Sequence, residues 1–340
     1  MSSNGNPCIL YGELYTKYKS EIISEVISKT NIEKNKLKHS KQNDVIIPCS
    51  GETAVDIAVA RCVPFDNVLL GGDLNIIRLH KYDGTFMAYQ LNSKRKIEIA
   101  KLAQGVSVVH LYGENLKSIN TYNPSLQEQQ KIVRLLSLLD ERIATQNKII
   151  EDLKKLKSAI RKRVFTSFKN GHTESCEINQ LIAYEQPTTY IVTNDEYSAD
   201  KTLTPVLTAN KAFVLGYTDE DFGIYQKGEC IIFDDFTMDA KYVSFPFKVK
   251  SSAIKILTAK PDVNLRFMFE YLSYLELKSE EHKRHYISEI ASLVIELPSK
   301  EKQNRIAYLM TSLDNKLALE ENTRARYMDE KRYLLSQMFI

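Results

Sequence analysis

Neither a long apolar stretch nor a secretion signal is present in the 340-residue sequence. The longest apolar runs, such as Val106–Leu111, are far shorter than the ~20 residues of a membrane-spanning helix. The N-terminus, Met1-Ser-Ser-Asn-Gly5, lacks the charged and then apolar pattern of a signal peptide. With 43% hydrophobic and 26% charged residues, the composition indicates a folded protein of two or three domains. We therefore expect a cytoplasmic protein without a membrane partner.

Cysteine is scarce and scattered. The five cysteines are odd in number and include no C-x-x-C pair, so the sequence predicts neither a disulfide framework nor a zinc site. We expect buried thiols in a reducing compartment. The positions are Cys8, Cys49, Cys62, Cys176 and Cys230.

Patterns typical of catalysis and cofactor binding are also missing. Gly71-Gly72-Asp73 belongs to no dinucleotide-binding or P-loop pattern. Asp234-Asp235 has no histidine or third carboxylate at a metal-ligand spacing, and His282 and His285 have no third ligand. We therefore predict no metal, no cofactor and no catalytic centre.

Charge is unevenly distributed around a formal net charge of +3. Lys and Arg exceed Asp and Glu by 15 to 12 in residues 1–123, by 10 to 5 in 124–168 and by 8 to 6 in 298–340, but are outnumbered 13 to 20 in 169–297. A protein that binds DNA unaided is expected to be more basic, because phosphate neutralisation supplies much of the affinity. If this chain binds DNA, we expect a partner to contribute part of the clamp.

An internal repeat is the strongest feature of the sequence. Residues 123–140 return as residues 297–314 at a constant offset of 174. The same offset pairs identical residues without a gap: Pro124 with Pro298, Gln129 with Gln303, Ile132 with Ile306, Leu139 with Leu313, Asp140 with Asp314, Lys157 with Lys331 and Phe165 with Phe339. Pro and Ser open both copies, and no Gly or internal Pro follows for about 40 residues. This predicts long helices over 124–168 and 298–340.

Apolar residues recur in both copies with the spacing of a coiled-coil seam. The predicted seam residues are Ile132, Leu136, Leu139, Ile143, Ile150, Leu153, Ile160 and Val164 in the first copy, and Ile306, Met310, Leu313, Leu317, Tyr327, Leu334 and Met338 in the second. Polar residues interrupt the seams, and such residues fix register and partner: Gln146, Lys157, Glu320, Arg324 and Lys331. A helix of about 43 residues is ~65 Å long, which favours antiparallel spacers over the alternative, two core helices of one bundle.

The segments 1–123 and 169–297 alternate short β-rich runs with turn residues. The predicted strands are 44–48, 67–71, 75–78 and 105–111 in the first segment, and 228–233, 242–249 and 254–257 in the second. Helices are predicted over Ile22–Ser28 and Leu265–Lys278. The predicted fold class is therefore α+β, with two globular domains, each followed by a long helix, in a pseudo-twofold repeat.

With these patterns the sequence resembles the specificity subunits of type I restriction-modification enzymes. The run from Pro-Ser-Leu-Gln-Glu-Gln-Gln-Lys-Ile to Leu-Leu-Asp at 124–140 is similar to that family's repeated helical region. Other stretches resemble the cores of its two target-recognition domains: 48–53, 70–74 and 103–110 in the first domain, and 204–208, 213–217, 232–237, 247–253 and 282–287 in the second.

The resemblance implies a protein that is not itself an enzyme. Each domain is expected to read half of a split double-stranded DNA target. The paired helices are expected to set the gap and to dock two methyltransferase subunits and, through them, restriction subunits. The repeat fits this picture, because two similar partners can grip one chain only if it offers similar surfaces twice.

One departure from the family concerns the first domain. With Pro7 aligned to Pro205, six residues precede the first core, whereas the 36 residues 169–204 precede the second. We therefore expect the first domain to lack an opening strand, which leaves the domain either impaired or able to work without it.

DNA contacts are expected from polar and basic residues near turns, where side chains can reach base edges and phosphates. In the second domain the predicted residues are Thr237, Lys241, Lys248, Lys250, Ser251 and Ser252, with the loop Lys283, Arg284, His285 and Tyr286. In the first domain they are Ser50, Gly51 and Thr53, with Lys94, Arg95 and Lys96 for phosphates. The alternative for both basic groups is a solvated charged face.

Two other functions stay open on the sequence alone. One is a coiled-coil adaptor whose globular segments bind protein, which the acidic segment 169–297 favours. The other is a nuclease or modification enzyme in its own right.

Overall fold

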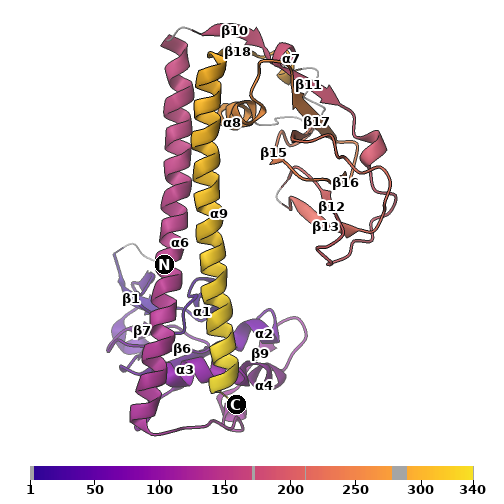
Figure 1. Ribbon diagram of the computed structural model, residues 1–340. Helices are drawn as coiled ribbons and strands as arrows, with labels where there is room; N and C mark the ends of the chain where they lie inside the picture. The colour runs from indigo at the N-terminus through magenta and orange to yellow at the C-terminus, as the bar shows by residue number, and fades with distance from the viewer. Residues whose placement is uncertain (1–3, 171–172, 211, 278–288, 340) are drawn as a thin grey trace. The chain divides into compact units, whose positions relative to one another are not determined.

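The computed structural model describes residues 4–170, 173–210, 212–277 and 289–339. It divides into two compact units (Figure 1): unit 1 comprises Met1–Ile149 with Glu320–Ile340, and unit 2 comprises Ile150–Leu319. Each unit holds one domain of mixed helices and strands and a part of each long helix. The α+β class with long helices is confirmed.

The domain of unit 1 is built around strand β4, which runs between two cores. Its three sheets have the strand orders β6-β4-β8, β2-β1-β7-β3 and β5-β9. Val45 and Ile47 of β4 pack toward helix α3, whereas Ile46 packs toward β1 and β7, as alternation along a strand requires. The elements are β1 (Asn6–Ile9), α1 (Glu13–Thr16), β2 (Ser28–Thr30), η1 (Lys34–Lys36), β3 (Lys38–His39), β4 (Asp44–Pro48), β5 (Ser50–Gly51), α2 (Ala54–Ile57), β6 (Arg61–Val63), β7 (Leu69–Leu70), β8 (Leu74–Ile77), α3 (Gly84–Asn92), α4 (Arg95–Lys101), β9 (Val109–His110) and α5 (Gly113–Leu116).

The domain of unit 2 has the same plan around strand β14. Its sheets have the orders β11-β17-β14-β15, β13-β12-β16 and β10-β18. Ile231 and Phe233 pack toward helix α8, and Ile232 packs toward β12 and β16. The elements are η2 (Ser167–Asn170), β10 (Glu174–Glu177), α7 (Ile178–Leu181), β11 (Ile182–Glu185), η3 (Thr188–Tyr190), β12 (Thr204–Leu207), β13 (Val214–Thr218), β14 (Cys230–Asp234), β15 (Ala240–Val243), β16 (Lys248–Val249), β17 (Ile254–Ala259), α8 (Leu265–Leu275) and β18 (Val294–Leu297).

Strand pairing repeats between the two domains. β1 pairs in parallel with β7, and β12 pairs in parallel with β16, so Pro7 and Pro205 each stand second in an equivalent strand. β4 lies between β6 and β8 as β14 lies between β15 and β17. In residues 4–123 no strand takes the place of β11 beside β8, which is the opening strand expected to be missing.

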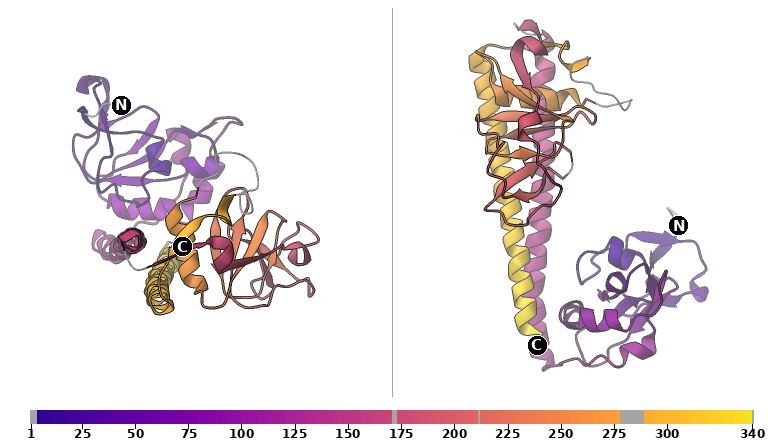
Figure 2. Two further views of the ribbon diagram at one scale, coloured as in Figure 1. Left: turned by 90° about the horizontal axis from the view of Figure 1, so that it is seen from above. Right: turned by 90° about the vertical axis from the view of Figure 1, so that its right-hand side faces the viewer.

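The long helices are α6 (Leu126–Thr166, 41 residues) and α9 (Lys300–Met338, 39 residues). Within each unit they lie side by side and antiparallel (Figure 2), because rising numbers on α6 meet falling numbers on α9. The apolar residues of the predicted seam are all buried or half-buried. In contrast, Leu135 and Leu138, outside the seam, are 42% and 50% exposed.

The sequence placed most strands of the central sheets correctly but failed for some helices. Strand 44–48 is observed as β4, and α8 occupies Leu265–Leu275. The helix predicted over Ile22–Ser28 is wrong: Ile23 is fully buried beside β6, its neighbour Ile22 bridges to Cys62, and β2 begins at Ser28. This stretch is rich in β-branched residues, which favour extended backbone.

Candidate DNA-reading surfaces and their helical junctions

A buried glutamine joins each long helix to a domain. The Oε1 atom of Gln129 on α6 accepts the backbone N–H of Asp83, at 2.9 Å, where α3 begins. Gln303 on α9 accepts the N–H of Asn264, at 2.9 Å, where α8 begins. Each glutamine also donates to the carbonyl of the proline that precedes its helix. Both copies of the repeat therefore have glutamine at this position, where one buried side chain forms hydrogen bonds with two backbone groups that water does not reach.

A lysine–aspartate ion pair joins the two long helices in each unit. Lys157 contacts Asp314 at 2.5 Å in unit 2, and Lys331 contacts Asp140 at 2.6 Å in unit 1. Both members of one pair lie 174 residues from the corresponding members of the other. Lys157 and Lys331, two of the polar interruptions in the predicted seam, thus each pair with an aspartate of the other long helix. These ion pairs fix the register of the two helices.

The surroundings of these ion pairs differ. In unit 2 the fully buried carboxylate of Glu270 on α8 meets three cations: Lys157 at 3.3 Å, Arg161 at 2.7 Å and Arg266 at 2.7 Å. At the equivalent position of α3, Tyr89 donates its hydroxyl to Asp140 at 2.5 Å. Burial, together with the negative charge of Asp140, raises the pKa of Tyr89. Unit 2 therefore carries a buried charge network where unit 1 has a neutral hydroxyl.

Equivalent loops meet at one end of each central sheet. We define the sheet-end loops as residues 49–53 and 71–73 in the first domain and 235–239 and 250–253 in the second. In the first domain the N–H of Cys49 donates to Asp73 O at 2.8 Å, and in the second that of Asp235 donates to Ala253 O at 2.9 Å. Seven of the predicted DNA-binding residues fall on these loops: Ser50, Gly51, Thr53, Thr237, Lys250, Ser251 and Ser252.

In the second domain the sheet-end loops present small hydroxyl side chains to solvent. Thr237, Ser251 and Ser252 are exposed. Beside them, Lys250 keeps 48% of its side chain exposed and lies 3.9 Å from Asp195. Lys241 is half-buried on β15. Four of the ten residues predicted for this domain, Thr237, Lys250, Ser251 and Ser252, therefore lie on adjoining loops.

Lys248, also predicted to contact DNA, is wrong for that role. Its side chain is fully buried, its Nζ forms an ion pair with Glu220, and the same atom donates to Phe222 O at 2.9 Å. Burial alone raises the pKa of Glu220, but hydrogen bonds from Lys248 and Thr193 outweigh it and leave that pKa at about 2. Lys248 on β16 is thus a buried structural residue that pairs with Glu220.

In the first domain only part of the predicted group is available. Ser50 is 5% exposed and donates to Asp73 at 3.0 Å, so its prediction as a DNA contact is wrong. At Gly51, an added Cβ would lie 2.5 Å from Ile57 Cγ2, so there is no room for a side chain at this position. Thr53 is exposed and caps α2 through the N–H of Asp56. Of the three, Thr53 alone offers an exposed side-chain oxygen.

The basic run predicted for phosphates lies at the turn between α3 and α4. Arg95 forms an ion pair with Glu98 at 2.8 Å. Lys94 lines a hollow of about 370 Å³ together with Arg332 and Leu335 of α9. Lys94 therefore lies beside the C-terminal end of α9. Lys96 is half-buried on α4. Lys283, Arg284, His285 and Tyr286 lie outside the described residues.

The repeated architecture agrees with a family match. Residues 2–155 and 173–326 each match the family described as "Type I restriction modification DNA specificity domain". The two matches together cover most of the 340 residues. The chain belongs to this family.

Several members and solved structures are similar to the chain. It is 39% identical over 165 residues to the Type I restriction enzyme EcoR124I/EcoR124II specificity subunit of Escherichia coli, covering 44% of this chain and 41% of that protein. It is 23% identical over 301 residues to the putative type I restriction enzyme MjaX specificity subunit of Methanocaldococcus jannaschii, covering 79% and 71%. The crystal structure of a type I restriction-modification S subunit from M. genitalium shares the fold, with a TM-score of 0.65 at 18% identity over 98% of this chain and 92% of that one. The chain thus spans about two fifths of the length of the E. coli subunit.

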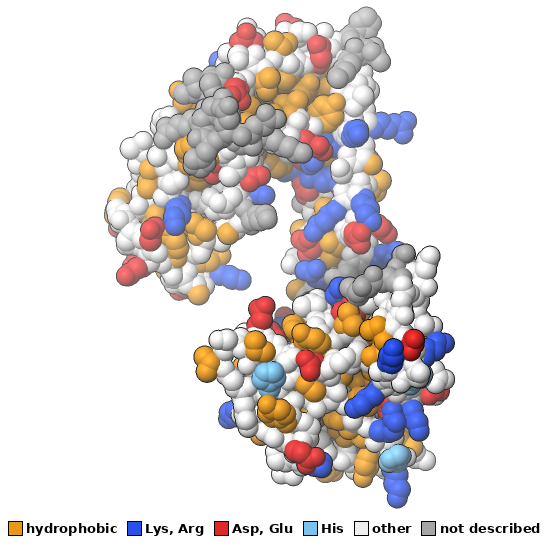
Figure 3. All heavy atoms as spheres, turned by 180° about the vertical axis from the view of Figure 1, so that it is seen from behind, with side chains coloured by type: hydrophobic (Ala, Val, Ile, Leu, Met, Phe, Trp, Pro, Cys, Tyr) orange, Lys and Arg blue, Asp and Glu red, His pale blue; other side chains and the backbone are white. Residues whose placement is uncertain are grey.

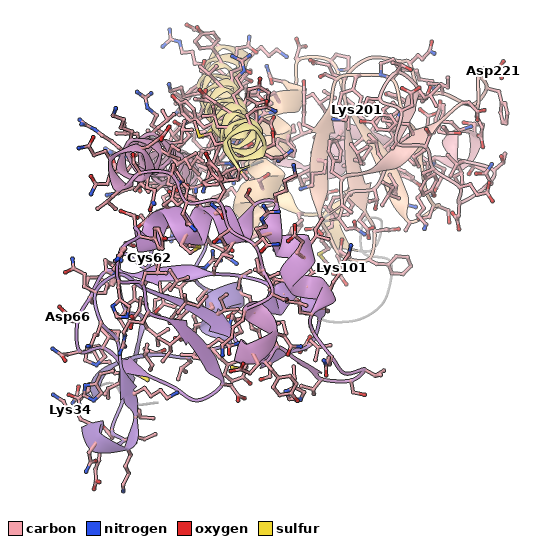
Figure 4. All side chains as sticks on the ribbon, turned by 90° about the horizontal axis from the view of Figure 1, so that it is seen from below. Lys34, Cys62, Asp66, Lys101, Lys201 and Asp221 are labelled. Carbon is pink, nitrogen blue, oxygen red and sulfur yellow. The ribbon has the colours of Figure 1, made fainter. Side chains whose placement is uncertain are left out.

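One basic surface of this specificity-family protein was not predicted. Lysines 34, 36, 38 and 41 are all exposed around η1 and β3, and Lys and Arg side chains gather at an edge of the first domain (Figure 3). Figure 4 places Lys34 at the tip of the domain, well away from Lys101 on α4. The sequence signal was the spacing of four lysines within eight residues.

Within the described part of the chain, no helix is long and apolar enough to cross a membrane, and no cluster of three or more His, Cys, Asp or Glu is arranged for a metal.

Burial raises the pKa of Cys62 to about 11 and that of Cys230 to about 12. Cys8 is buried as well, but Cys49 and Cys176 are half-buried, so the expectation of buried thiols holds for three of the five.

Proposed function

We propose that the chain is the DNA-recognition subunit of a type I restriction-modification complex and reads a bipartite double-stranded target, one half with each domain. The observation that carries this proposal is the equivalence of the sheet-end loops. Two domains with the same topology present the same pair of loops, joined by the same backbone hydrogen bond, with different side chains. Because the two domains share a backbone framework but differ in the side chains on their loops, they are suited to reading two different short DNA sequences.

The helical junctions suit the role of a spacer. Each long helix is tied to a domain by a buried glutamine, and the two helices are tied to each other by the lysine–aspartate pairs. We propose that this scaffold sets the gap between the two half-sites. It offers similar surfaces twice, so it fits two methyltransferase subunits and, through them, restriction subunits. In this proposal the chain acts in the cytoplasm and leaves the chemistry to its partners.

The DNA-reading surface assigned to the second domain consists of Thr237, Lys250, Ser251 and Ser252, with Lys241 at its edge. The loop Lys283–Tyr286 stays a prediction, with Arg284 as the residue for guanine, since an Arg that is bidentate to guanine contributes ~1–3 kcal/mol of discrimination. For the first domain we assign Thr53 to base contacts and the lysines at 34–41 to phosphates, with Lys94–Lys96 as a further phosphate group.

A selection experiment tests the function. The purified chain, with and without its methyltransferase partner, is incubated with a randomised DNA pool, and bound DNA is sequenced. We expect the complex to enrich two short motifs separated by a fixed gap, and the chain alone to bind weakly because its net charge is only +3. Absence of enrichment would favour the coiled-coil adaptor, which the family match otherwise disfavours.

A further inference from the structure

A narrow loop between α4 and β9, residues 104–110, stands beside the sheet-end loops of the first domain. Two backbone hydrogen bonds close its base: the N–H of Gln104 donates to His110 O at 2.9 Å, and the N–H of His110 donates to Gln104 O at 2.7 Å. The turn requires Gly105, because its φ of +121° is in the region that favours glycine and an added Cβ would collide with the carbonyl of Val108. We name this segment the 104–110 loop.

Strand β9 attaches the 104–110 loop to the sheet-end loops. His110 is paired with Ser50 of β5 in an antiparallel register, and the N–H of Leu111 donates to Cys49 O at 2.7 Å. Val109 and Leu111 are buried in the core of the domain, so they anchor the loop from below. The loop is therefore held in place next to residues 49–53.

A cation lies close to the same surface. Burial and the charge of Asp73 raise the pKa of Cys49, and the charge of Lys38 on β3 acts against this rise. Lys38 is exposed, and it belongs to the lysines that are assigned to phosphates. The 104–110 loop thus adjoins both the sheet-end loops and a phosphate contact of the proposed DNA surface.

The 104–110 loop presents uncharged side chains to solvent. Val106 is 98% exposed and Val108 is 52% exposed. Gln104, Ser107 and His110 are exposed as well. Residues 103–112 include no Lys, Arg, Asp or Glu. An amide and two branched apolar side chains therefore project from a loop of fixed shape.

This set of side chains fits one kind of base pair. A Gln amide can form two hydrogen bonds with N6 and N7 of adenine, and apolar side chains contact the C5-methyl group of thymine. Guanine is most often read by Arg or Lys, and cytosine by Glu or Asp, which are the residue types that 103–112 lacks. The major groove admits a two-stranded ribbon, so a narrow loop closed by one pair of strands can enter it.

We propose that the 104–110 loop enters the major groove of the half-site read by the first domain and selects A·T base pairs there. Gln104 contacts an adenine, and Val106 and Val108 contact the methyl groups of neighbouring thymines. This inference rests on the proposed function, because it assigns base pairs to one half of the bipartite target.

The first test uses the unaltered chain with altered DNA. The complex with the proposed methyltransferase partner selects sites from a randomised pool, and the half that stays constant with Thr237→Ala, Ser251→Ala and Ser252→Ala is resynthesised with base analogues. Uracil lacks the thymine methyl group and should weaken binding roughly 4-fold for each contacted thymine. 7-Deazaadenine lacks the N7 acceptor and should weaken binding roughly 2- to 10-fold at one adenine.

Variants then assign each loss to a side chain. Gln104→Ala should lower the preference for adenine at one position roughly 5- to 150-fold and should remove the effect of 7-deazaadenine. Val106→Ser with Val108→Ser should remove the effect of uracil. Ile27→Ser is the matched control, since Ile27 is a β-branched residue of the same domain that is 51% exposed, and it should keep both effects.

Three results would overturn the proposal: a half-site of G·C pairs, analogues without effect on the unaltered protein, or variants that keep the analogue effects and change only the salt dependence. The analogue comparison uses the unaltered protein, so it remains decisive even if a variant fails to fold. Selection of a continuous motif or of no motif would instead overturn the proposed function, and the inference with it.

Discussion

The two domains share their attachment to the helices and differ in what they present. Both are held by a buried glutamine at the start of an equivalent helix. Yet the connection between β2 and β4, residues 31–43, carries four lysines and one glutamate, whereas its counterpart between β13 and β14, residues 219–229, carries one lysine and four acidic residues. The duplication thus preserved the interactions that position a domain and changed the surfaces that a ligand would meet.

The largest difference should appear at the equivalent positions Glu270 and Tyr89. Glu270→Ala removes the buried carboxylate that three partly buried cations share and should destabilise unit 2 by ~3–5 kcal/mol. Tyr89→Phe removes one hydrogen bond to Asp140 and should cost unit 1 ~1–3 kcal/mol. Urea unfolding followed by hydrogen exchange in each unit measures both. Equal losses of unfolding free energy in the two variants would show that the charge network of unit 2 stabilises its unit no more than the Tyr89 hydrogen bond stabilises unit 1.

The junction glutamines should behave alike. Gln129→Leu and Gln303→Leu each leave two backbone groups unpaired at the start of a domain, so each should lower the free energy of unfolding of its own unit by ~1–3 kcal/mol. Glutamate at the same site keeps one acceptor and serves as the matched control. If one leucine variant proved neutral, the two junctions would not be equivalent.

Sequence patterns revealed the repeat and the long helices because a seam and a constant offset are local regularities. The strand β4 was also predictable, since Val45, Ile46 and Ile47 are uniformly apolar. The role of Lys248 was not, because a lysine is buried only when a distant residue, here Glu220, supplies the opposite charge. Ser50 failed for the same reason, since its partner Asp73 lies 23 residues away. Helix α3 was not predicted, because it begins with Gly84 and Thr85, which have low helix propensity, and is stabilised by tertiary packing instead.

The basic run of the first domain should affect one half of the target only. Replacing Lys36, Lys38 and Lys41 by Gln should lower the salt dependence of DNA binding by about one unit of slope for each lysine that neutralises a phosphate, without changing the preferred bases. Binding of the methyltransferase complex at several salt concentrations measures the slope. Replacing Lys201 and Lys260 of the second domain, both exposed, is the matched control, and an equal change there would remove the distinction between the domains.

The smallest effect concerns acid. The pKa of Glu220 is about 2 in the folded chain, against an ordinary value of 4.5, so its ion pair stabilises the second domain above pH 4.5 and loses that contribution as pH falls toward 2. The first domain has Leu69 in place of Lys248 and should not share this dependence. Glu220→Gln combined with Lys248→Met should flatten the acid slope of the second domain in thermal melts from pH 5 to pH 2. An unchanged slope would assign the acid sensitivity to other carboxylates.

Mapping methylated DNA sites tests the division of labour between the domains most directly. The chain and the proposed methyltransferase partner are expressed in cells that lack other DNA methylation. Modified sites are then sequenced for the unaltered protein and for a variant with Thr237→Ala, Ser251→Ala and Ser252→Ala. A split motif should appear, and the triple variant should relax one half of it while the other half and the gap stay constant. A continuous motif, or a variant that altered both halves together, would contradict the assignment of one half-site to each domain.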